Sequence, residues 1–480
     1  MLVSTLHFQE NKKAQKWFAF ADQDAMILVD SLALNSHIRP AITDHPGWGH
    51  RIFYAAYFKI LNKLNLFDIF NIEHFRPDPI LTWSRLVLKA RDLSFFISSL
   101  LLGAAVGILV FSFTSNKWWA LFGFSIWLFL PGVSLQSVLV RSEPISSLFG
   151  CLSLIALVYS VRIQSNPWNS VLLTMSGVFF GLACFTKIQA IPYIAIALFY
   201  IMFKTPSPAG TFPKEKVGIY VKIKKILKEI YLYFTGFLLS HFIVLLSLLF
   251  FLNKENAFEY WNRLMYAIYD PVQKMETFAR QKDILLVSKA AISTTYHFFI
   301  KVYPLTILLA LFLLVIGLKE RKKNYFAPIG LVILLFLFNF TLSFRGNARI
   351  YYVYTGVFVV LAITLSGYYL FQYLNLKNWN KTLVLIGVIV IGLIHFVPTY
   401  LSLPAQRESI KKFKCSNKFR KENRKFGKKF WFGRKDVIRF YNEYGLPEIY
   451  YIIMKECYPS KRVYLEKLKE FESRKIREKM

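Results

Sequence analysis

The stretch IQSNPWNSVLLTMSGVFFGLACFTKIQAIPYIAIALFYIMF, residues 163–203, decides the class of fold. Between Arg162 and Lys204 the only charged residue is Lys187. One unbroken helix through this stretch would be about 60 Å long, twice the roughly 30 Å apolar core of a bilayer. The stretch therefore predicts two membrane-spanning helices that meet in a turn at Lys187, and Pro192 just beyond it favours a bend there.

The whole chain has the composition of a multi-span membrane protein. Of its 480 residues, 55% are hydrophobic and 18% are charged, against about 25% charged in an ordinary soluble domain. This composition excludes a soluble enzyme with one water-facing core. Long uncharged runs predict about ten transmembrane helices, near residues 94–113, 118–140, 144–161, 170–186, 188–203, 231–252, 298–318, 326–343, 352–374 and 381–400.

Basic residues in the short loops set the predicted orientation. The segment 204–229 and the cluster 319–323 are rich in Lys and Arg, which favours the cytoplasmic side for both. Counting spans from these two segments places five other parts of the chain on the opposite, extracytoplasmic face. These parts are residues 1–92, the Arg141 turn, Lys187, the loop 253–297 and the loop 344–351.

Three regions follow from this count. Residues 1–92 form a first extracytoplasmic loop, residues 93–400 form the multi-span domain, and residues 401–480 form a basic, partly helical tail. The count places the tail outside, against the positive-inside rule, from which long translocated segments are largely exempt. A first loop of this length needs a leading helix to cross the membrane, so we expect an apolar helix upstream of Met1.

Acidic residues of this acid-poor chain gather in the first loop. Ala25 to Asn35 is apolar at helical spacing, and either Asp22 or Asp24 is placed to cap its start. Arg51 to Leu66 is amphipathic, which predicts a helix along the membrane surface. The acids and histidines of this loop are Asp22, Asp24, Asp30, Asp44, His45 and His50.

Two turns on the same predicted face carry notable charges. Arg141-Ser-Glu-Pro144 places Arg141 and Glu143 at a helix start, where the pair either neutralises itself or serves a site. Lys187 has no carboxylate near it in the sequence. It therefore either snorkels to the membrane interface or binds an anion.

A third turn, Ser343-Phe-Arg-Gly-Asn-Ala-Arg-Ile-Tyr-Tyr352, offers Arg345, Arg349 and Tyr351. Two arginines can grip a phosphate with forked donors, although a plain interfacial belt of Arg and Tyr has the same composition. Together the loop acids and these cations form a workable site for transfer from a lipid-phosphate donor.

The order of these features resembles the polytopic GT-C glycosyltransferases, in the branch of protein O-mannosyltransferases and aminoarabinose transferases. The likeness covers about residues 15–205 and extends loosely to the later spans. Ala25 stands where that family commonly has Glu, which leaves the choice between Asp22 and Asp24 open. The matching motifs are Asp22-Gln-Asp24, Asp44-His-Pro46, Arg141-Ser-Glu-Pro144, Gly181-Leu-Ala-Cys-Phe-Thr-Lys187 and Arg349-Ile-Tyr-Tyr352.

The resemblance implies an all-α integral membrane enzyme, GT-C-like, with juxtamembrane helices in its first extracytoplasmic loop. It implies transfer of a hexose or pentose from a polyprenyl-phosphate-linked donor to a glycan, lipid or protein acceptor, with inversion at the anomeric carbon. The reaction would take place on the outer face of a bacterial cell membrane, among membrane lipids.

Roles for individual residues follow from the same resemblance. Asp24 or Asp22 would take the proton of the acceptor hydroxyl. Cations would hold the phosphate as its charge grows on leaving. No cofactor is predicted: the sequence has no GxxxxGK loop, and no spacing selects a metal. The predicted substrate-binding residues are His45, Asp44, Arg141, Glu143, Lys187, Arg345, Arg349 and Tyr351.

Two other functions stay open at this stage. A transporter or flippase for lipid-linked sugars would also have many spans, but the sequence shows neither related halves nor ionisable residues near the middle of spans. A catalytically inactive, truncated scaffold is compatible with Ala25. Nucleic acid is not predicted as a partner, because an anionic membrane surface explains the basic tail equally well.

Overall fold

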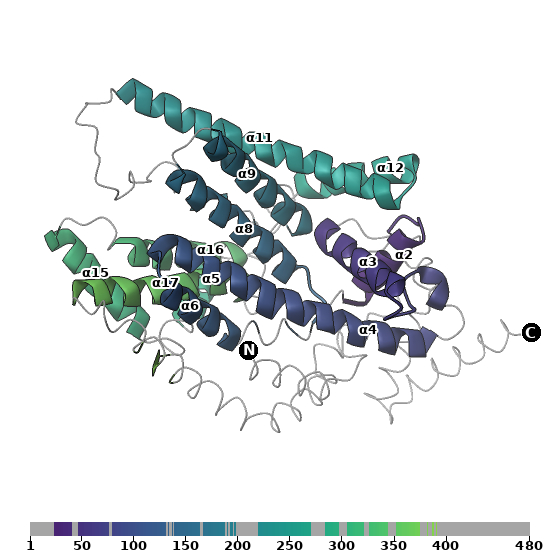
Figure 1. Cartoon of the computed structure of the whole chain (residues 1–480), viewed down its shortest axis with the longest axis horizontal. Coiled ribbons are helices and arrows are strands. Elements are labelled where there is room, and N and C mark those ends of the chain that lie inside the picture. The colour runs from purple at the N-terminus through teal and green to yellow at the C-terminus, as the bar shows by residue number, and fades with distance from the viewer. Residues whose placement is uncertain are drawn as a thin grey trace, which may run out of the picture.

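A computed structural model describes most of residues 24–374 and a few residues beyond. Every regular element in this part of the chain is helical (Figure 1). The described residues are 24–40, 47–75, 79–130, 139–163, 167–187, 219–269, 284–296, 305–320, 326–343 and 352–374, with isolated residues within 133–137, 190–197 and 382–390. The helices are α2 (Asp24–Asn35), α3 (Trp48–Lys63), η1 (Ile72–Phe75), α4 (Pro79–Phe95), η2 (Phe96–Leu101), α5 (Leu102–Thr114), α6 (Lys117–Phe129), α8 (Glu143–Arg162), α9 (Trp168–Thr186), α11 (Ile219–Phe251), α12 (Lys254–Tyr269), α14 (Ile284–Tyr296), α15 (Leu305–Glu320), α16 (Ala327–Ser343) and α17 (Tyr352–Tyr373).

The long helices lie side by side in chain order. The helix α8 packs against α9 and α5, and α9 packs against α11. At one end of this array α2, α3 and α12 gather, while α15, α16 and α17 lie toward the other side (Figure 1). The first loop is helical where the sequence predicted helices, as α2 and α3, and α3 contacts α8 and α9 directly.

In the described part of the chain, five helices are long and apolar enough to cross a membrane, as expected of a multi-pass membrane protein. The apolar helix Ala327–Asn339 is shorter, and α15 has 16 residues. The expected spans 188–203 and 381–400 and the tail 401–480 lie mostly or wholly outside the described residues, so the predicted total of ten is not confirmed. The five helices are Thr82–Thr114, Glu143–Arg162, Trp168–Thr186, Ile223–Phe251 and Val353–Tyr373.

Two boundaries differ from the sequence expectation. The run 118–140 does not form one helix, because α6 ends at Phe129 and Leu130 is extended. Pro131 follows, and a proline disfavours helical backbone at the residue before it. The helix over 94–113 begins earlier than expected: α4, the π-helical turn η2 and α5 run on as one helix, so the predicted boundary between residues 92 and 93 falls inside it.

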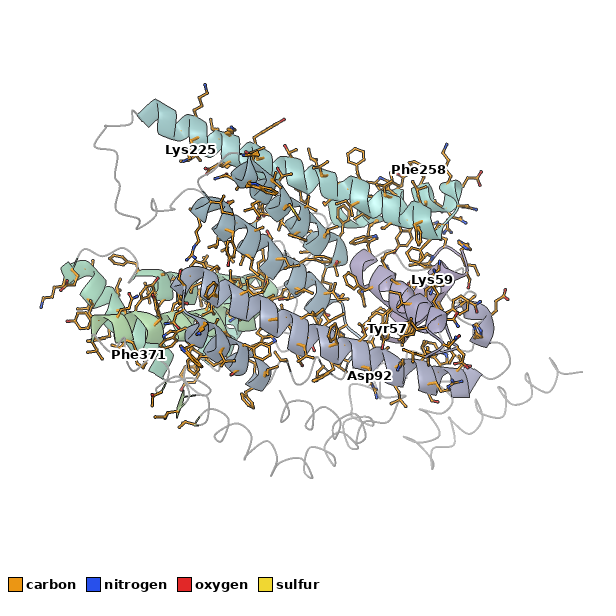
Figure 2. All side chains as sticks on the ribbon, viewed as in Figure 1. Tyr57, Lys59, Asp92, Lys225, Phe258 and Phe371 are labelled. Atoms are coloured by element: carbon orange, nitrogen blue, oxygen red, sulfur yellow. The ribbon has the colours of Figure 1, made fainter. Side chains whose placement is uncertain are left out.

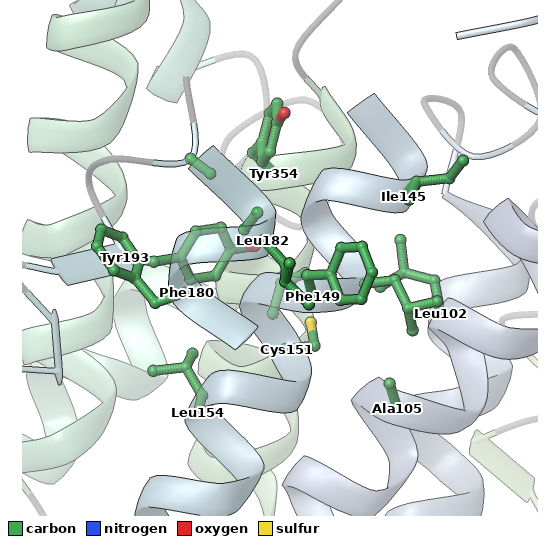
Figure 3. Close-up of a cluster of buried hydrophobic side chains, with 14 of the residues drawn as sticks. Leu102, Ala105, Ile145, Phe149, Cys151, Leu154, Phe180, Leu182, Tyr193 and Tyr354 are labelled. Atoms are coloured by element: carbon green, nitrogen blue, oxygen red, sulfur yellow. The ribbon is translucent and has the colours of Figure 1, made fainter. Parts of the chain in front are cut away.

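The core around α8 is apolar on nearly every side. Figure 3 shows Phe149 of α8 close to Leu102 of α5, with Phe180 and Leu182 of α9 on the other side. Cys151 and Cys184 are buried free thiols in this core. Because α8 is packed between α5 and α9, the position of its first residue, Glu143, is fixed by the bundle.

The crossing of α9 and α11 depends on glycines. A Cβ on Gly177 would collide with the backbone carbonyl of Tyr233, and a Cβ on Gly236 would collide with that of Thr174. Helices in a membrane approach this closely only through small residues. The two glycines therefore set the distance between the helices.

Gly177→Ala and Gly236→Ala should each lower the free energy of unfolding by about 1–3 kcal/mol, because the atoms in the way belong to the backbone. Gly330→Ala is the matched control, since a Cβ there meets nothing within 4 Å. It should be neutral or stabilise by up to about 1 kcal/mol. Unfolding of the full chain in mixed detergent micelles measures all three, and equal values would contradict the close-crossing argument.

Candidate functional site

The start of α3 packs closely against the end of α9. A Cβ on Gly49 would collide with the Thr186 side chain, which is fully buried and donates a hydrogen bond of 2.8 Å to the carbonyl oxygen of Leu182. Only glycine permits this approach. As a result, His50 and Arg51 lie beside the last turn of α9, where the chain leaves the helix at Lys187.

Three charged side chains meet at the start of α8. The Arg141 guanidinium makes two contacts with the Glu143 carboxylate, with Nη2 2.9 Å from Oε1 and Nε 3.2 Å from Oε2. Lys187 Nζ lies 3.6 Å from the same Oε1. The side-chain exposures are 0% for Glu143, 8% for Arg141 and 13% for Lys187, so Lys187 is the member that reaches closest to the surface. We call these three residues the Glu143 triad.

Local structure explains why the triad forms here. Glu143 and Pro144 open α8, where a carboxylate complements the helix dipole and proline tolerates the missing hydrogen bond. The helix α9 ends at Thr186 and Lys187 is extended, as the sequence predicted for a break at this lysine. The Ser146 hydroxyl donates to the carbonyl oxygen of Ala183 at 2.9 Å, which ties the start of α8 to the end of α9.

The first residues of α17 reach the same end of α8. The Ser147 hydroxyl lies 3.4 Å from the carbonyl oxygen of Val353 and 3.1 Å from the Tyr193 phenol oxygen. Ser147 follows Glu143 by one helical turn. The chain enters α17 directly from the predicted Arg345 to Tyr351 motif, whose residues lie outside the described part.

A second buried ion pair adjoins the triad. Arg51 Nε lies 2.9 Å from Asp30 Oδ2, and Arg51 Nη1 donates to the Tyr260 phenol oxygen at 2.7 Å. All three side chains are buried. Burial raises the pKa of Tyr260 above its ordinary value, so the phenol is neutral and accepts from Arg51. This pair fastens α2, α3 and α12 to one another.

Charges of both ion clusters act on His50. It is 2% exposed, and neither ring nitrogen has a hydrogen-bond partner among the residues that the structure describes. Burial and the Arg51 guanidinium hold the pKa of His50 well below its ordinary value, with Lys187 and Arg141 adding to the effect and Glu143 opposing it. The imidazole is therefore neutral at pH 7.

The structure brings three of the predicted site residues together and describes no other predicted side chain. Arg141, Glu143 and Lys187 form the triad. Asp24 begins α2, but its side chain is outside the described part. The remaining predicted residues outside the described part are Asp22, Asp44, His45, Arg345, Arg349 and Tyr351.

Lys187 has no carboxylate near it in the sequence, but Glu143 contacts it in space, because α8 and α9 are antiparallel neighbours. Sequence reasoning also left His50, Asp30, Arg51 and Tyr260 out of the site. A carboxylate inside the apolar stretch DAMILVDSLALN was a readable signal for Asp30, whereas its partner Arg51 is set by tertiary packing.

Within the described residues, no group of three or more His, Cys, Asp or Glu side chains could hold a metal ion. The arrangement instead offers cations, a neutral imidazole and a carboxylate at one end of an apolar bundle. Such a set can bind an anion and stabilise charge that develops on it.

Comparison with known proteins gives one similar structure. No family model matches the chain, and no curated protein matches it. The crystal structure of the Archaeoglobus fulgidus oligosaccharyltransferase, in complex with zinc and sulfate, aligns with a TM-score of 0.47 and 12% sequence identity. The alignment covers 86% of this chain and 55% of that chain, so this chain spans about half the length of that protein. A likeness of this degree does not establish a family.

Proposed function

We propose that the chain is a membrane glycosyltransferase that moves a sugar from a polyprenyl-phosphate donor to an extracytoplasmic acceptor, with inversion at the anomeric carbon. The observation that carries the proposal is the Glu143 triad. It joins two motifs on which the resemblance to PMT-type GT-C enzymes rests, Arg141-Ser-Glu-Pro144 and the segment that ends at Lys187. The α3 segment that follows the third motif, Asp44-His-Pro46, packs against the same place.

Each group then has a role in the transfer. Lys187 binds the donor phosphate and stabilises the negative charge that grows on it as the bond from C1 to the phosphate oxygen breaks. Arg349 and His45 assist from their own segments. Glu143 and Arg141 act on Lys187, because the buried carboxylate fixes the ammonium group at the end of α9. Asp24, or Asp22, takes the proton of the acceptor hydroxyl as its oxygen attacks C1.

The placement of charge along α11 supports an extracytoplasmic site. Exposed lysines, Lys224, Lys225 and Lys228, lie near the start of this helix, and its other end leads to α12 and Tyr260 beside the site. Figure 2 shows Lys225 at one end and Phe258 of α12 at the other. The positive-inside rule favours the cytoplasm for the lysine end, which leaves the site on the opposite face.

The test is sugar transfer by the full chain in proteoliposomes, with a panel of labelled polyprenyl-phosphate hexoses and pentoses and a membrane extract as acceptor. Lys187→Gln should lower turnover by about 10²-fold, because a preorganised cation facing developing charge is lost. Lys225→Gln, an exposed lysine at the far end of α11, should leave turnover unchanged. Movement of the labelled donor across the bilayer without transfer would show a flippase instead, and neither transfer nor movement would favour an inactive scaffold.

A further inference from the structure

The His50 imidazole is a polar group that the described chain buries without a partner. It is 2% exposed, and its ring meets the Tyr54 ring edge-on, with centroids 6.1 Å apart. The large majority of buried side-chain polar atoms in proteins have a hydrogen-bond partner, and leaving one unpaired is destabilising. No described residue supplies a hydrogen-bond partner for His50, so both ring nitrogens are available to a ligand.

The charges around His50 define what that partner can be. The groups that act on it are Arg51 on its own helix, Arg141 and Glu143 at the start of α8, and Lys187 after α9. Arg51 is engaged by Asp30, and the Glu143 carboxylate is engaged by Arg141 and Lys187. In the Glu143 triad two cations surround one carboxylate, so the triad carries a net positive charge. The ligand that suits this site is therefore an anion.

A neutral imidazole suits this position better than a further cation would. It offers one N–H donor and one acceptor lone pair, so it can bind an anionic oxygen without adding positive charge next to Arg51 and Lys187. The close contact between Gly49 and Thr186 fixes the backbone just before His50 beside the end of α9, and the imidazole itself is buried. The residue is therefore positioned before any ligand binds.

We propose that His50 donates a hydrogen bond to a non-bridging phosphate oxygen at a subsite that it shares with Lys187. The inference rests on the proposed function, in which that phosphate belongs to the lipid-linked donor. His50 keeps its proton throughout and takes no part in bond making or breaking. It is a binding residue that positions the phosphate against the ammonium group of Lys187.

This role predicts that one variant, His50→Leu, keeps its stability but loses affinity for phosphate. His50→Leu removes the unpaired polar group and fills its space, so the unliganded protein should be as stable as the wild type or more stable. The same change should raise the dissociation constant for farnesyl monophosphate about tenfold to a hundredfold, because a hydrogen bond to a charged oxygen is lost. His50→Gln keeps an N–H donor and should stay within about threefold of the wild type.

The experiment uses the full chain in detergent and two measurements, the unfolding midpoint without ligand and the affinity for each probe. The probes are farnesyl monophosphate, farnesol and inorganic phosphate, so that lipid-borne and free phosphate are distinguished. Farnesol should bind equally to the wild type and His50→Leu. His241→Leu is the matched control: this half-buried histidine of α11 has a ring nitrogen 3.0 Å from the carbonyl oxygen of Phe237, and the change should leave phosphate binding unaltered.

Each contrary outcome has its own meaning. If His50→Leu binds farnesyl monophosphate like the wild type, the subsite is wrong while the transfer assay still judges the proposed function. If His50→Leu unfolds several degrees earlier and His50→Gln does not restore binding, the imidazole is structural and the subsite is wrong. Binding of farnesyl monophosphate without any sugar transfer would leave the subsite standing and overturn the proposed function.

Discussion

Asp24→Asn is expected to lower turnover by about 10²-fold to 10⁴-fold with little change in donor binding, as for the loss of a general base. The helix α2 begins at Asp24, and its following turns are held by buried Leu28 and Leu32 and by the pair of Asp30 with Arg51. The start of α2 is thereby fixed relative to the site. Asn keeps the shape and the capping ability of Asp while removing its basicity. Transfer of labelled sugar in proteoliposomes measures turnover, and equilibrium binding of the donor is measured separately.

Asp22→Asn is the comparison that assigns the base. Asp22 precedes α2, so its variant should lose less turnover than Asp24→Asn. A dead Asp22→Asn beside a nearly normal Asp24→Asn would reverse the assignment. Full activity in both variants would show that neither carboxylate takes the proton, and the mechanism would need another base.

The helices could be predicted where their signals are local. Apolar length identified α8, α9, α11 and α17, and the lone charge at Lys187 located the end of α9. The end of α6 also has a local signal, because Pro131 lies inside the apolar run 118–140. The continuity of α4 with α5 has no local signal, since the polar residues near Arg91 and Asp92 resemble the edge of a membrane span. In the structure Arg91 is buried against other parts of the protein. The helix can therefore continue past this charged residue instead of ending at it.

The site was predictable only in part because its contacts join residues far apart in the sequence. Arg141 and Glu143 are two residues apart, so their pairing was one of the two readings that the sequence allowed. The contact of Lys187 with Glu143 depends on how α8 and α9 pair, which no local pattern contains. His50 follows Gly47-Trp-Gly49, and the need for glycine at 49 becomes visible only when Thr186 is placed against it.

Glu143→Gln should lower the free energy of unfolding by about 3–5 kcal/mol, which is the usual effect of breaking a buried ion pair from one side. Glutamine keeps the size of the side chain but removes the negative charge, so Arg141 and Lys187 are left as like charges in a buried place. The loss should be partly reversed in the double variant Glu143→Gln with Lys187→Met, because one of the two cations is then replaced by an apolar side chain of similar length. Unfolding of the full chain in mixed micelles gives the three values.

The pair of Asp68 with Arg85 supplies the matched control. Arg85 also contacts its carboxylate twice, with Nη1 3.0 Å and Nη2 2.7 Å from the Asp68 oxygens, but the side chains of Asp68 and Arg85 are 62% and 47% exposed. Asp68→Asn should therefore change the free energy of unfolding by only about 0–1 kcal/mol, since water screens an exposed pair. Both variants remove a carboxylate that one guanidinium contacts twice, so the two sites differ chiefly in burial and in the added contact of Glu143 with Lys187. Equal losses at Asp68 and Glu143 would mean that the Glu143 triad is solvated in the membrane, and a solvated Lys187 could not act as a preorganised cation in the transfer that we propose.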